Sequence, residues 1–370
     1  MNNNHQTKIM YLITGLSTGG AEMLIRDIVE RIDSDRFEIV VVSILPLGQI
    51  GKQIRDFGIK TLSLGALNKF NPQSLWLLLK ILREEKPDIL HTHLFHADIL
   101  GRIAGTMSKV KCIVSTIHNV EFGGFFREKL LSRTRFLVDM NIAVSNMVAN
   151  NAVEKGIVSN DKVQVVYNGI DLEKFSIKDK MKMRDDLNLD KDKSVFVSVG
   201  SLTQQKGYQY LLEAVRENNI NSLFIILGEG AEQANLENML KEYNLKDKII
   251  LKGNVNNVNE YLQAADFFVM PSLWEGFSVA LLEAAWAGKV IIATDVGGNG
   301  EIIRDTKNGF LIPAKDAQKL ANKIKHVLSL SLGERQHISQ QVKKEVKDKY
   351  SIKQMVSNYE GFYNYIMQSR

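Results

Sequence analysis

The sequence of 370 residues contains a single cysteine, Cys112, so the chain cannot form an internal disulfide. Cys112 lies in the apolar run KCIVSTI, where a buried and unreactive thiol is expected, and this usage fits a reducing compartment. No apolar run approaches the ~18 residues needed to span a bilayer. The N-terminus also lacks a secretory signal core followed by a small-residue cleavage site. We therefore expect a cytoplasmic protein.

The charged residues form no long Lys/Arg block and no repeat of aromatic and basic residues, which argues against nucleic acid as a partner. A G-x-G-x-x-G fingerprint is missing as well, which argues against a dinucleotide-dependent enzyme. The formal net charge of +5 suits anionic partners, such as diphosphates or acidic membrane surfaces. The composition does not choose between these two.

Short apolar, β-branched runs alternate with amphipathic stretches along the whole chain. This rhythm of strand and helix is typical of an α/β protein with parallel sheets covered on both faces. Twelve such runs are too many for one open sheet, and the length suits two domains of about 150–200 residues. The predicted strands are residues 8–14, 37–45, 60–64, 88–93, 111–117, 138–144, 162–166, 194–200, 223–227, 248–251, 266–270 and 289–294.

The polar segment 171–193 predicts the domain boundary, with a first domain of residues 1–173 and a second of residues 174–350. The remaining residues, 351–370, form a predicted terminal helix. Its apolar side chains recur at helical spacing and must pack on another part of the protein. They are Ile352, Met355, Tyr359, Phe362 and Ile366.

The segment 266–301 contains the most informative motif. A predicted strand leads into a loop with Glu275 and Gly276, and a helix begins near Phe277 and Ser278. Unpaired N–H groups at a helix start attract anions, and Gly276 lets a ligand approach closely. Glu283 follows inside an almost wholly apolar helix, where an unpaired carboxylate is costly. Vicinal hydroxyls of a sugar would satisfy Glu283, and a structural Arg or Lys is the alternative.

Three further features follow predicted strands. Lys206 comes six residues after Gly200, where it can reach phosphate oxygens or remain a solvated surface lysine. The pair Gly19 and Gly20 permits close contact with a ligand or forms a tight turn. His118 follows the run KCIVSTI. It either contacts a ligand or is a structural histidine whose hydrogen bonds are made within the protein.

The segment DILHTHLFH places His91 and His93 on one face of a strand, with His96 on the helix beyond. Zinc is the less favoured interpretation, because neither a carboxylate nor a cysteine accompanies these histidines. We expect His93 on the acceptor side of a cleft and no metal site.

Together, Glu275 and Glu283 form an E-x7-E element. In that context the sequence resembles the retaining nucleotide-sugar glycosyltransferases of the GT-B fold, usually numbered family four, of the type that builds bacterial cell-surface polysaccharides. The matching motifs extend along nearly the whole chain. They are GGAE at 19–22, His118, NGID at 168–171, GSLTQQKG at 200–207, GEG at 228–230, PSLWEGFSVALLEA at 271–284, and GGN at 297–299 with Glu301.

The resemblance implies two Rossmann-like parallel-sheet domains facing a central cleft, with the C-terminal helix returning to the N-terminal domain. The C-terminal domain would bind the donor, and the N-terminal domain the acceptor. Glu283 would hold the ribose, Glu275 the transferred sugar and Lys206 the diphosphate. The other implied contacts are Gly19, Gly20 and the Phe277–Ser278 backbone with the sugar or phosphates, His118 beside the sugar, and Gly228, Asn254 and Val255 around the base.

The resemblance further implies transfer of a hexose or related sugar from a nucleoside-diphosphate donor to a saccharide or lipid-linked acceptor, with retention of anomeric configuration and without metal or cofactor. Uridine is the family's common base, and guanosine stays open. Ser201 departs from the family, which often has Arg there, so the diphosphate would have one cation fewer. The alternatives are a GT-B nucleotide-sugar epimerase and a non-catalytic partner subunit of a transferase.

The predicted helix 125–138 combines aromatic and leucine side chains with basic residues. An ordinary surface helix would pack its apolar side inward. The alternative is peripheral contact with an acidic membrane, at the inner face of the plasma membrane.

Overall fold

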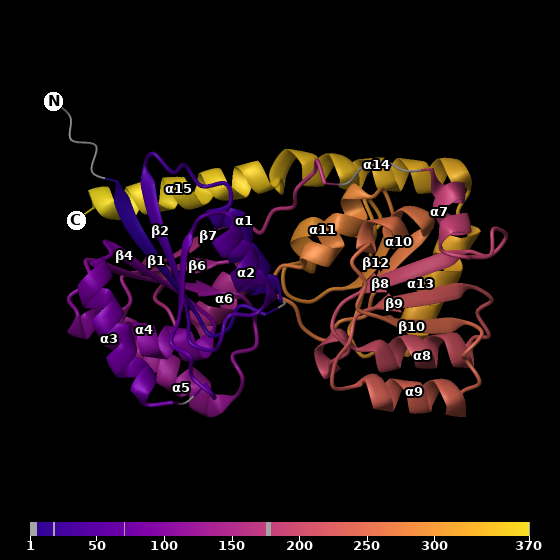
Figure 1. The fold of residues 1–370 in the computed structure, drawn as a ribbon. Coiled ribbons are helices and arrows are strands. Elements are labelled where there is room, and N and C mark those ends of the chain that lie inside the picture. Colours follow the sequence, from indigo (N-terminus) through magenta and orange to yellow (C-terminus); the bar gives the residue numbers. More distant parts are fainter. Residues whose placement is uncertain (1–5, 18, 70, 175–178, 370) are drawn as a thin grey trace. The chain divides into compact units, whose positions relative to one another are not determined.

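The computed structural model describes residues 6–17, 19–69, 71–174 and 179–369 (Figure 1). The chain divides into two compact units. The N-terminal unit comprises residues 1–168 and 352–370, and the C-terminal unit comprises residues 169–351. Each unit is a Rossmann-like parallel sheet with helices packed on it, so the predicted fold class is confirmed.

The sheet of the N-terminal unit has seven parallel strands in the order β3-β2-β1-β4-β5-β6-β7. Side chains of the inner strand β1 alternate between two cores, because successive residues of a strand point to opposite faces. Ile9 and Tyr11 enter one hydrophobic cluster, and Met10 and Leu12 enter the other. The strands are β1 (Thr7–Ile13), β2 (Phe37–Ser43), β3 (Lys60–Ser63), β4 (Ile89–His93), β5 (Cys112–Ile117), β6 (Met140–Ala143) and β7 (Val163–Val165).

The helices of this unit cover both faces of the sheet. The cluster around Ile9 contains side chains from α1 (Gly20–Val29), α2 (Gln49–Asp56) and the terminal helix α15 (Ile352–Gln368). The cluster around Met10 contains side chains from α3 (Gln73–Glu85) and α4 (Phe95–Met107). Two further helices, α5 (Phe125–Thr134) and α6 (Asn146–Glu154), contribute to a smaller cluster beside α4.

The sheet of the C-terminal unit has six parallel strands in the order β10-β9-β8-β11-β12-β13. Five were predicted, and β13 (Phe310–Ile312) was missed because three residues at a sheet edge are too short for a period-two pattern. The others are β8 (Val195–Val199), β9 (Leu223–Leu227), β10 (Ile249–Gly253), β11 (Phe267–Met270) and β12 (Val290–Thr294).

The helices of the C-terminal unit are α7 (Lys180–Asp186), α8 (Tyr208–Glu217), α9 (Gln233–Glu242), α10 (Val258–Ala264), α11 (Val279–Trp286), α12 (Asn299–Ile302), α13 (Ala317–Ser329) and α14 (Leu332–Lys349). The start of α14 is fixed by a capping box, in which Ser331 and Glu334 satisfy each other's backbone N–H groups. Among the helices of the described ranges, none is both long enough and apolar enough to cross a bilayer.

Buried hydrogen bonds fix the packing of α15 on the first sheet. Tyr363 of α15 places its hydroxyl 2.6 Å from the Tyr11 hydroxyl and 2.7 Å from His91 Nδ1. The other ring nitrogen of His91 lies 2.7 Å from Thr116 Oγ1. The buried polar groups of Tyr363, Tyr11 and His91 therefore each have a partner, as is usual in protein interiors. Burial lowers the pKa of His91 to about 3, and the neighbouring His118 adds to this shift.

The low pKa of His91 predicts a pH-dependent stability. The unfolded chain has an ordinary histidine pKa of about 6.5, so between that pH and pH 3 it binds one proton more than the folded chain. The stabilisation by neutral His91 is fully present above pH 6.5 and is lost as the pH falls toward 3.

His91→Gln removes this titration. The free energy of unfolding in urea, measured between pH 7 and pH 5, should decline less steeply for the variant, by up to about 1.4 kcal/mol per pH unit. The matched control is His337→Gln, at an exposed site in the C-terminal unit, and it should keep the wild-type slope. Parallel curves for His91→Gln and wild type would contradict the assignment.

Candidate active site

In the C-terminal unit, the strand order reverses between β8 and β11. In open parallel sheets, ligands bind at the carboxyl ends of the strands beside such a reversal. The loop after β8 ends in the short helix η3 (Gln204–Lys206), and the loop after β11 carries Glu275. Backbone and side-chain bonds join the two loops, since Leu273 N donates to Gln205 O over 2.7 Å and Gln205 Nε2 donates to Trp274 O over 2.9 Å.

The side chains of Lys206 and Glu275 meet at this reversal. Lys206 Nζ lies 2.6 Å from Glu275 Oε1, and the side chains are only 15% and 7% exposed. Ser272 Oγ donates to the same oxygen over 2.7 Å. Both bonds end on Oε1, so Oε2 receives no hydrogen bond from the described residues. The structure thus joins Lys206, predicted to contact the diphosphate, and Glu275, predicted to contact the sugar, in one ion pair. Both the ammonium group and the carboxylate can form further hydrogen bonds.

Glycines allow the backbone around this pair to pack closely. Gly297, at φ 53°, presses against the Glu275 carbonyl, and an added Cβ there would lie 2.0 Å from that oxygen. Gly228, at φ 140°, lies against the Gly200 carbonyl in the same way, at 2.2 Å. Both positions also have a backbone conformation that side chains rarely adopt. These contacts explain why glycine is needed at positions 228 and 297 of the predicted motifs, without reference to a ligand.

Helix α11 begins beside the ion pair. Its N-cap is Ser278, whose Oγ accepts a hydrogen bond from Leu281 N over 3.3 Å. Phe277 is buried and packs on Tyr350 with ring centroids 5.1 Å apart. The preceding residue, Gly276, is buried too, and its carbonyl accepts from Gly298 N over 2.7 Å. The helix start is therefore held rigidly, and its first-turn amides point out of the helix end.

Glu283 differs from the expectation in its burial. It is partly exposed, whereas its neighbours Leu281, Leu282, Ala284 and Ala285 form the buried side of α11. The apolar sequence alone could not show this, because alanines tolerate both sides of a helix surface. The desolvation argument for Glu283 is therefore weaker than predicted, and its proposed ligand role remains a prediction.

The residues predicted around the base lie at the ends of neighbouring strands. Asn254 follows β10 and donates from Nδ2 to Glu229 Oε2 over 3.0 Å. Ser201 and Asn254 are exposed, and Val255 is partly exposed. Because β10, β9 and β8 are adjacent and parallel, these loops share one edge of the sheet with Lys206. Their roles stay predictions.

The N-terminal unit contains its own cavity, of about 430 Å³, at the carboxyl ends of β1, β4 and β5. His118 lines it after β5, and Leu94 lines it after β4. Leu94 has a φ of 70°, which is strained for a branched side chain and is typical of functional sites. The strand order also reverses between β1 and β4, so this cavity has the position expected of a ligand site.

A pair of neutral histidines forms one side of this region. His93 Nδ1 lies 3.0 Å from His118 Nε2, and His93 itself is fully buried. Burial lowers the pKa of His118 to about 4 and that of His93 well below its ordinary value. His118 lines the cavity, whereas His93 contacts His118 and is not among the lining residues, so its acceptor-side role remains a prediction. The His93 Nε2 atom is buried and has no partner among the described residues.

The glycine pair after β1 does not form a tight turn. Gly19 is extended, with φ 177°, and Gly20 begins α1. An added Cβ at Gly20 would meet nothing within 4 Å. Neither glycine is required by its backbone conformation, although an added Cβ at Gly19 would lie 2.5 Å from Glu22 Oε2. The ligand contact of this glycine pair remains a prediction.

Two cations at the cavity were not singled out as ligands from the sequence. Lys69 is exposed, and Arg127 lies with its guanidinium 4.8 Å from the centre of the Phe95 ring. Neither forms an ion pair with a carboxylate of the described residues. Both lower the pKa of His96, after the larger effect of burial. No sequence motif marks Lys69 and Arg127, because they come from two segments that are far apart in the sequence.

Metal-binding residues do not gather in the described part of the chain. Its His, Cys, Asp and Glu side chains form no group of three or more that could hold a metal ion. His91, part of the less favoured zinc interpretation, uses both ring nitrogens for Tyr363 and Thr116.

Two family models match the chain in succession. Residues 18–174 match the model described as Glycosyltransferase Family 4, and residues 179–345 match the one described as Glycosyl transferases group 1. Over 294 residues the chain is 33% identical to the Escherichia coli UDP-Gal:alpha-D-GlcNAc-diphosphoundecaprenol alpha-1,3-galactosyltransferase, a match that covers 74% of this chain and 75% of that enzyme.

A second relative is the N-acetylgalactosamine-N,N'-diacetylbacillosaminyl-diphospho-undecaprenol 4-alpha-N-acetylgalactosaminyltransferase of Campylobacter jejuni, 29% identical over 202 residues, or 52% of this chain and 54% of that one. Among solved structures, Anabaena HepE in complex with UDP-glucose superposes with a TM-score of 0.86 and 21% identity, covering 97% of this chain and all of that one. At that identity the likeness shows the fold alone, which is GT-B. From the family models and the galactosyltransferase relative, we conclude that this chain is a glycosyltransferase and belongs to glycosyltransferase family 4.

Proposed function

We propose that this protein transfers a hexose or related sugar from a UDP-sugar to a lipid-linked saccharide diphosphate, with retention of anomeric configuration, during surface polysaccharide synthesis. The Lys206–Glu275 pair at the strand reversal supports the donor assignment most directly. The names of two relatives support the acceptor, since both state a sugar carried on a diphosphate-linked polyprenol. The E. coli relative's name also states a UDP-linked donor.

Lys206 would exchange partners when the donor binds. In the free protein its ammonium bonds Glu275, and a diphosphate carries more negative charge than one carboxylate. An ammonium group has three protons, so Lys206 can bond a phosphate oxygen and keep Glu275 in contact. Glu275 then accepts hydrogen bonds from sugar hydroxyls through Oε2. One pair thereby positions both parts of the donor, on either side of the bond that breaks.

The start of α11 would complete the diphosphate site. The amides of Val279 and Ala280 belong to its first turn, where α-helical geometry provides no partner for the N–H groups. Together with the positive end of the helix dipole, they stabilise charge that develops on the leaving diphosphate. Glu283, one helical turn further along, would hold the ribose hydroxyls. These groups supply the stabilisation that we propose in place of a metal ion or cofactor.

The chemistry of the side chains favours transfer on the leaving group's own face. Inverting transfer uses a general base, which is most effective with a pKa near the working pH. His118, with a pKa of about 4, is a weak base, and Glu275 is occupied by Lys206 and Ser272. On the retaining route, the bond from the anomeric carbon to the diphosphate breaks, and the acceptor hydroxyl attacks that carbon from the same side. A departing phosphate oxygen takes the hydroxyl proton.

The first functional prediction concerns the ion pair. Lys206→Met and Glu275→Gln should each lower kcat/KM by roughly ten- to a hundredfold, because each loses a charged hydrogen bond worth about 1.5–3 kcal/mol. The double variant should lose less than the sum, since the two residues act together. Steady-state assays with a UDP-sugar measure this, and the exposed Lys246→Gln serves as control. Wild-type rates in both single variants would disprove the donor site.

The stereochemical prediction is an α-linked product from an α-linked donor. NMR of the isolated product gives the configuration of the new linkage directly. A β-linked product of direct transfer would disprove the retaining route while leaving the ion-pair result intact. If the protein converts the donor to an isomerised nucleotide sugar in the absence of acceptor, its activity is epimerisation and the proposed transfer is wrong.

Lys69 and Arg127 are proposed to bind the diphosphate of the acceptor in the N-terminal cavity. Lys69→Gln and Arg127→Gln should each reduce kcat/KM roughly ten- to a hundredfold for a diphosphate-linked acceptor, through loss of a charged contact. A neutral alkyl glycoside of the same sugar should react equally with variant and wild type. Lys52→Gln, exposed on α2 of the same unit, is the matched control. Equal losses on both acceptors would contradict diphosphate binding.

A further inference from the structure

His93 is a buried histidine to which the proposed reaction assigns no step. It ends β4, and its side chain is fully buried. Its Nδ1 atom lies 3.0 Å from Nε2 of His118, which follows β5 and lines the N-terminal cavity. In a hydrogen bond between two imidazole rings, one nitrogen donates and the other accepts. The contact therefore depends on where each ring carries its hydrogen.

Both rings of this pair are neutral near neutral pH. Burial lowers the pKa of His118 to about 4. Burial also lowers the pKa of His93 well below its ordinary value, with smaller contributions from His91 and His118. A neutral imidazole carries one hydrogen, on either Nδ1 or Nε2. Two arrangements can therefore form the bond: His93 donates from Nδ1, or His118 donates from Nε2.

The second nitrogen of His93 distinguishes these two arrangements. His93 Nε2 is buried and has no hydrogen-bond partner among the described residues. If His118 donated, the hydrogen of His93 would lie on Nε2, as a buried N–H group without an acceptor. If His93 donates, Nε2 carries only a lone pair. Among buried backbone groups, an N–H without an acceptor is rarer than an under-satisfied acceptor. The hydrogen-bond network thus favours donation from His93 to His118.

The rings next to His93 support this choice. The ring centroid of His91 lies 4.4 Å from that of His93. Both nitrogens of His91 already have partners, in Tyr363 and Thr116. The ring of Tyr11 lies 5.7 Å from that of His93, and its hydroxyl pairs with Tyr363. The polar atoms of these neighbours are engaged with one another, so a lone pair at His93 Nε2 fits the surroundings better than a hydrogen.

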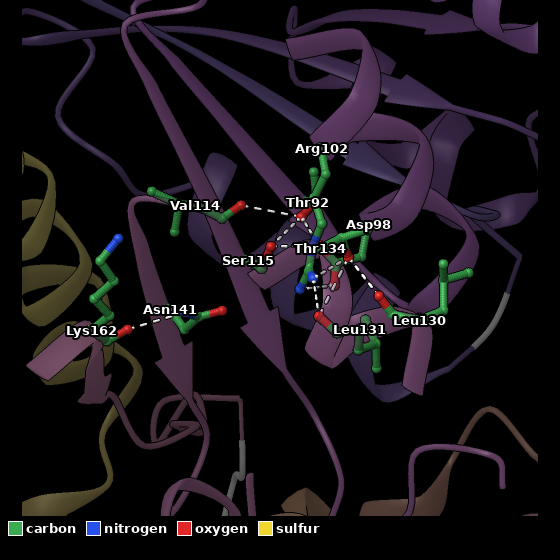
Figure 2. Close-up of polar contacts among 10 residues, drawn as sticks. All are labelled: Thr92, Asp98, Arg102, Val114, Ser115, Leu130, Leu131, Thr134, Asn141 and Lys162. Carbon is green, nitrogen blue, oxygen red and sulfur yellow. Dashed lines mark hydrogen bonds and ion pairs between the residues drawn. The ribbon is translucent and has the colours of Figure 1, made fainter. Parts of the chain in front are cut away.

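The other face of β4 holds His93 in place. The preceding residue, Thr92, points to the opposite side of the sheet, because successive side chains of a strand alternate. There, Thr92 Oγ1 lies 2.9 Å from Asp98 Oδ1 and 2.9 Å from Ser115 Oγ, as Figure 2 shows. Thr92 and Ser115 are also partners in the register of β4 and β5. The packed sheet therefore sets the separation of His93 and His118.

We propose that His93 is a positioning residue, which fixes His118 in the tautomer with hydrogen on Nδ1 and so makes His118 a hydrogen-bond donor to a substrate oxygen. Nε2 of His118 accepts from His93 and cannot take a proton from a substrate hydroxyl. His118 is partly exposed, and its Nδ1 forms no hydrogen bond with the described residues. Donation to a sugar or phosphate oxygen rests on the proposed function, whereas the tautomer does not.

Nitrogen-15 NMR of the full chain, labelled on histidine, tests the tautomer directly. A ring nitrogen that carries hydrogen resonates far from one that does not, and couplings to the ring hydrogens distinguish Nδ1 from Nε2. The His118 signals are those lost in His118→Gln. At pH 7, wild type should have hydrogen on Nδ1 of His118 and none on Nε2. The reverse tautomer would overturn the proposal.

Two substitutions of His93 separate its hydrogen bond from its volume. His93→Leu removes the donor, so the second tautomer of His118 should appear. His93→Asn places an amide N–H close to the position of Nδ1 and should preserve the wild-type tautomer. Circular dichroism and thermal unfolding check the fold, and the wild-type and asparagine spectra decide the matter if the leucine variant does not fold. A His118 spectrum that a folded His93→Leu leaves unchanged would overturn the proposal.

Transfer kinetics test whether His93 acts through His118. With a UDP-sugar, His93→Leu should lower kcat/KM roughly two- to tenfold, the effect of one uncharged hydrogen bond, and His93→Asn should restore most of the loss. In a His118→Gln background, His93→Leu should cause no further loss. A merely structural role would instead lower the rate by the same factor in both backgrounds, and that result would contradict the proposal.

The control and the dependence on function are separable. His337→Gln, at an exposed site in the C-terminal unit, should change neither the His118 spectrum nor the rate. If the protein transfers no sugar at all, the proposed function fails, while the NMR measurement still decides whether His93 fixes the tautomer of His118.

Discussion

The parallel direction of all strands is the constraint on which both units depend. Every strand pair in the two sheets is parallel, so each helix returns the chain to the same end of the sheet and each strand ends at the same edge. Segments far apart in sequence, such as Lys206 and Glu275, then meet after neighbouring strands. The same rule places His93 and His118 side by side, because β4 and β5 are adjacent. Site geometry follows from topology in each unit separately.

The pairing of charges decides which ionic groups are structural and which are available to bind a ligand. Arg102 and Asp98 are almost fully buried, and every bond they make stays inside the N-terminal unit. Lys206 and Glu275 are also shielded, but their pair has unused acceptor and donor capacity. Removing one member of a buried pair leaves a desolvated charge, whereas exchanging a partner for a stronger anion does not. Only the second kind of pair suits reversible ligand binding.

Much of the fold and part of the site could be predicted from the sequence. Long apolar, β-branched runs marked twelve strands, and β13 was missed because its three residues carry no periodic signal. The motif around Glu275 indicated a loop followed by a helix, and the structure has Ser278 as the cap of that helix. The burial of Glu283 was overestimated, since alanine-rich helices do not reveal which side faces the core. Lys69 and Arg127 went unnoticed because isolated cations carry no motif.

The sequence by itself determined the element types, the two-domain α/β class and the family, because these depend on local periodicity and on motifs spaced along the chain. Tertiary structure alone decided which charges pair. It placed Lys206 on Glu275, brought the buried His93 into contact with His118, and used Arg102 to bond the C-terminal turn of α5. The physical reason is that pairing and desolvation depend on distances between residues remote in sequence, and those distances exist only after the strands have assembled into sheets.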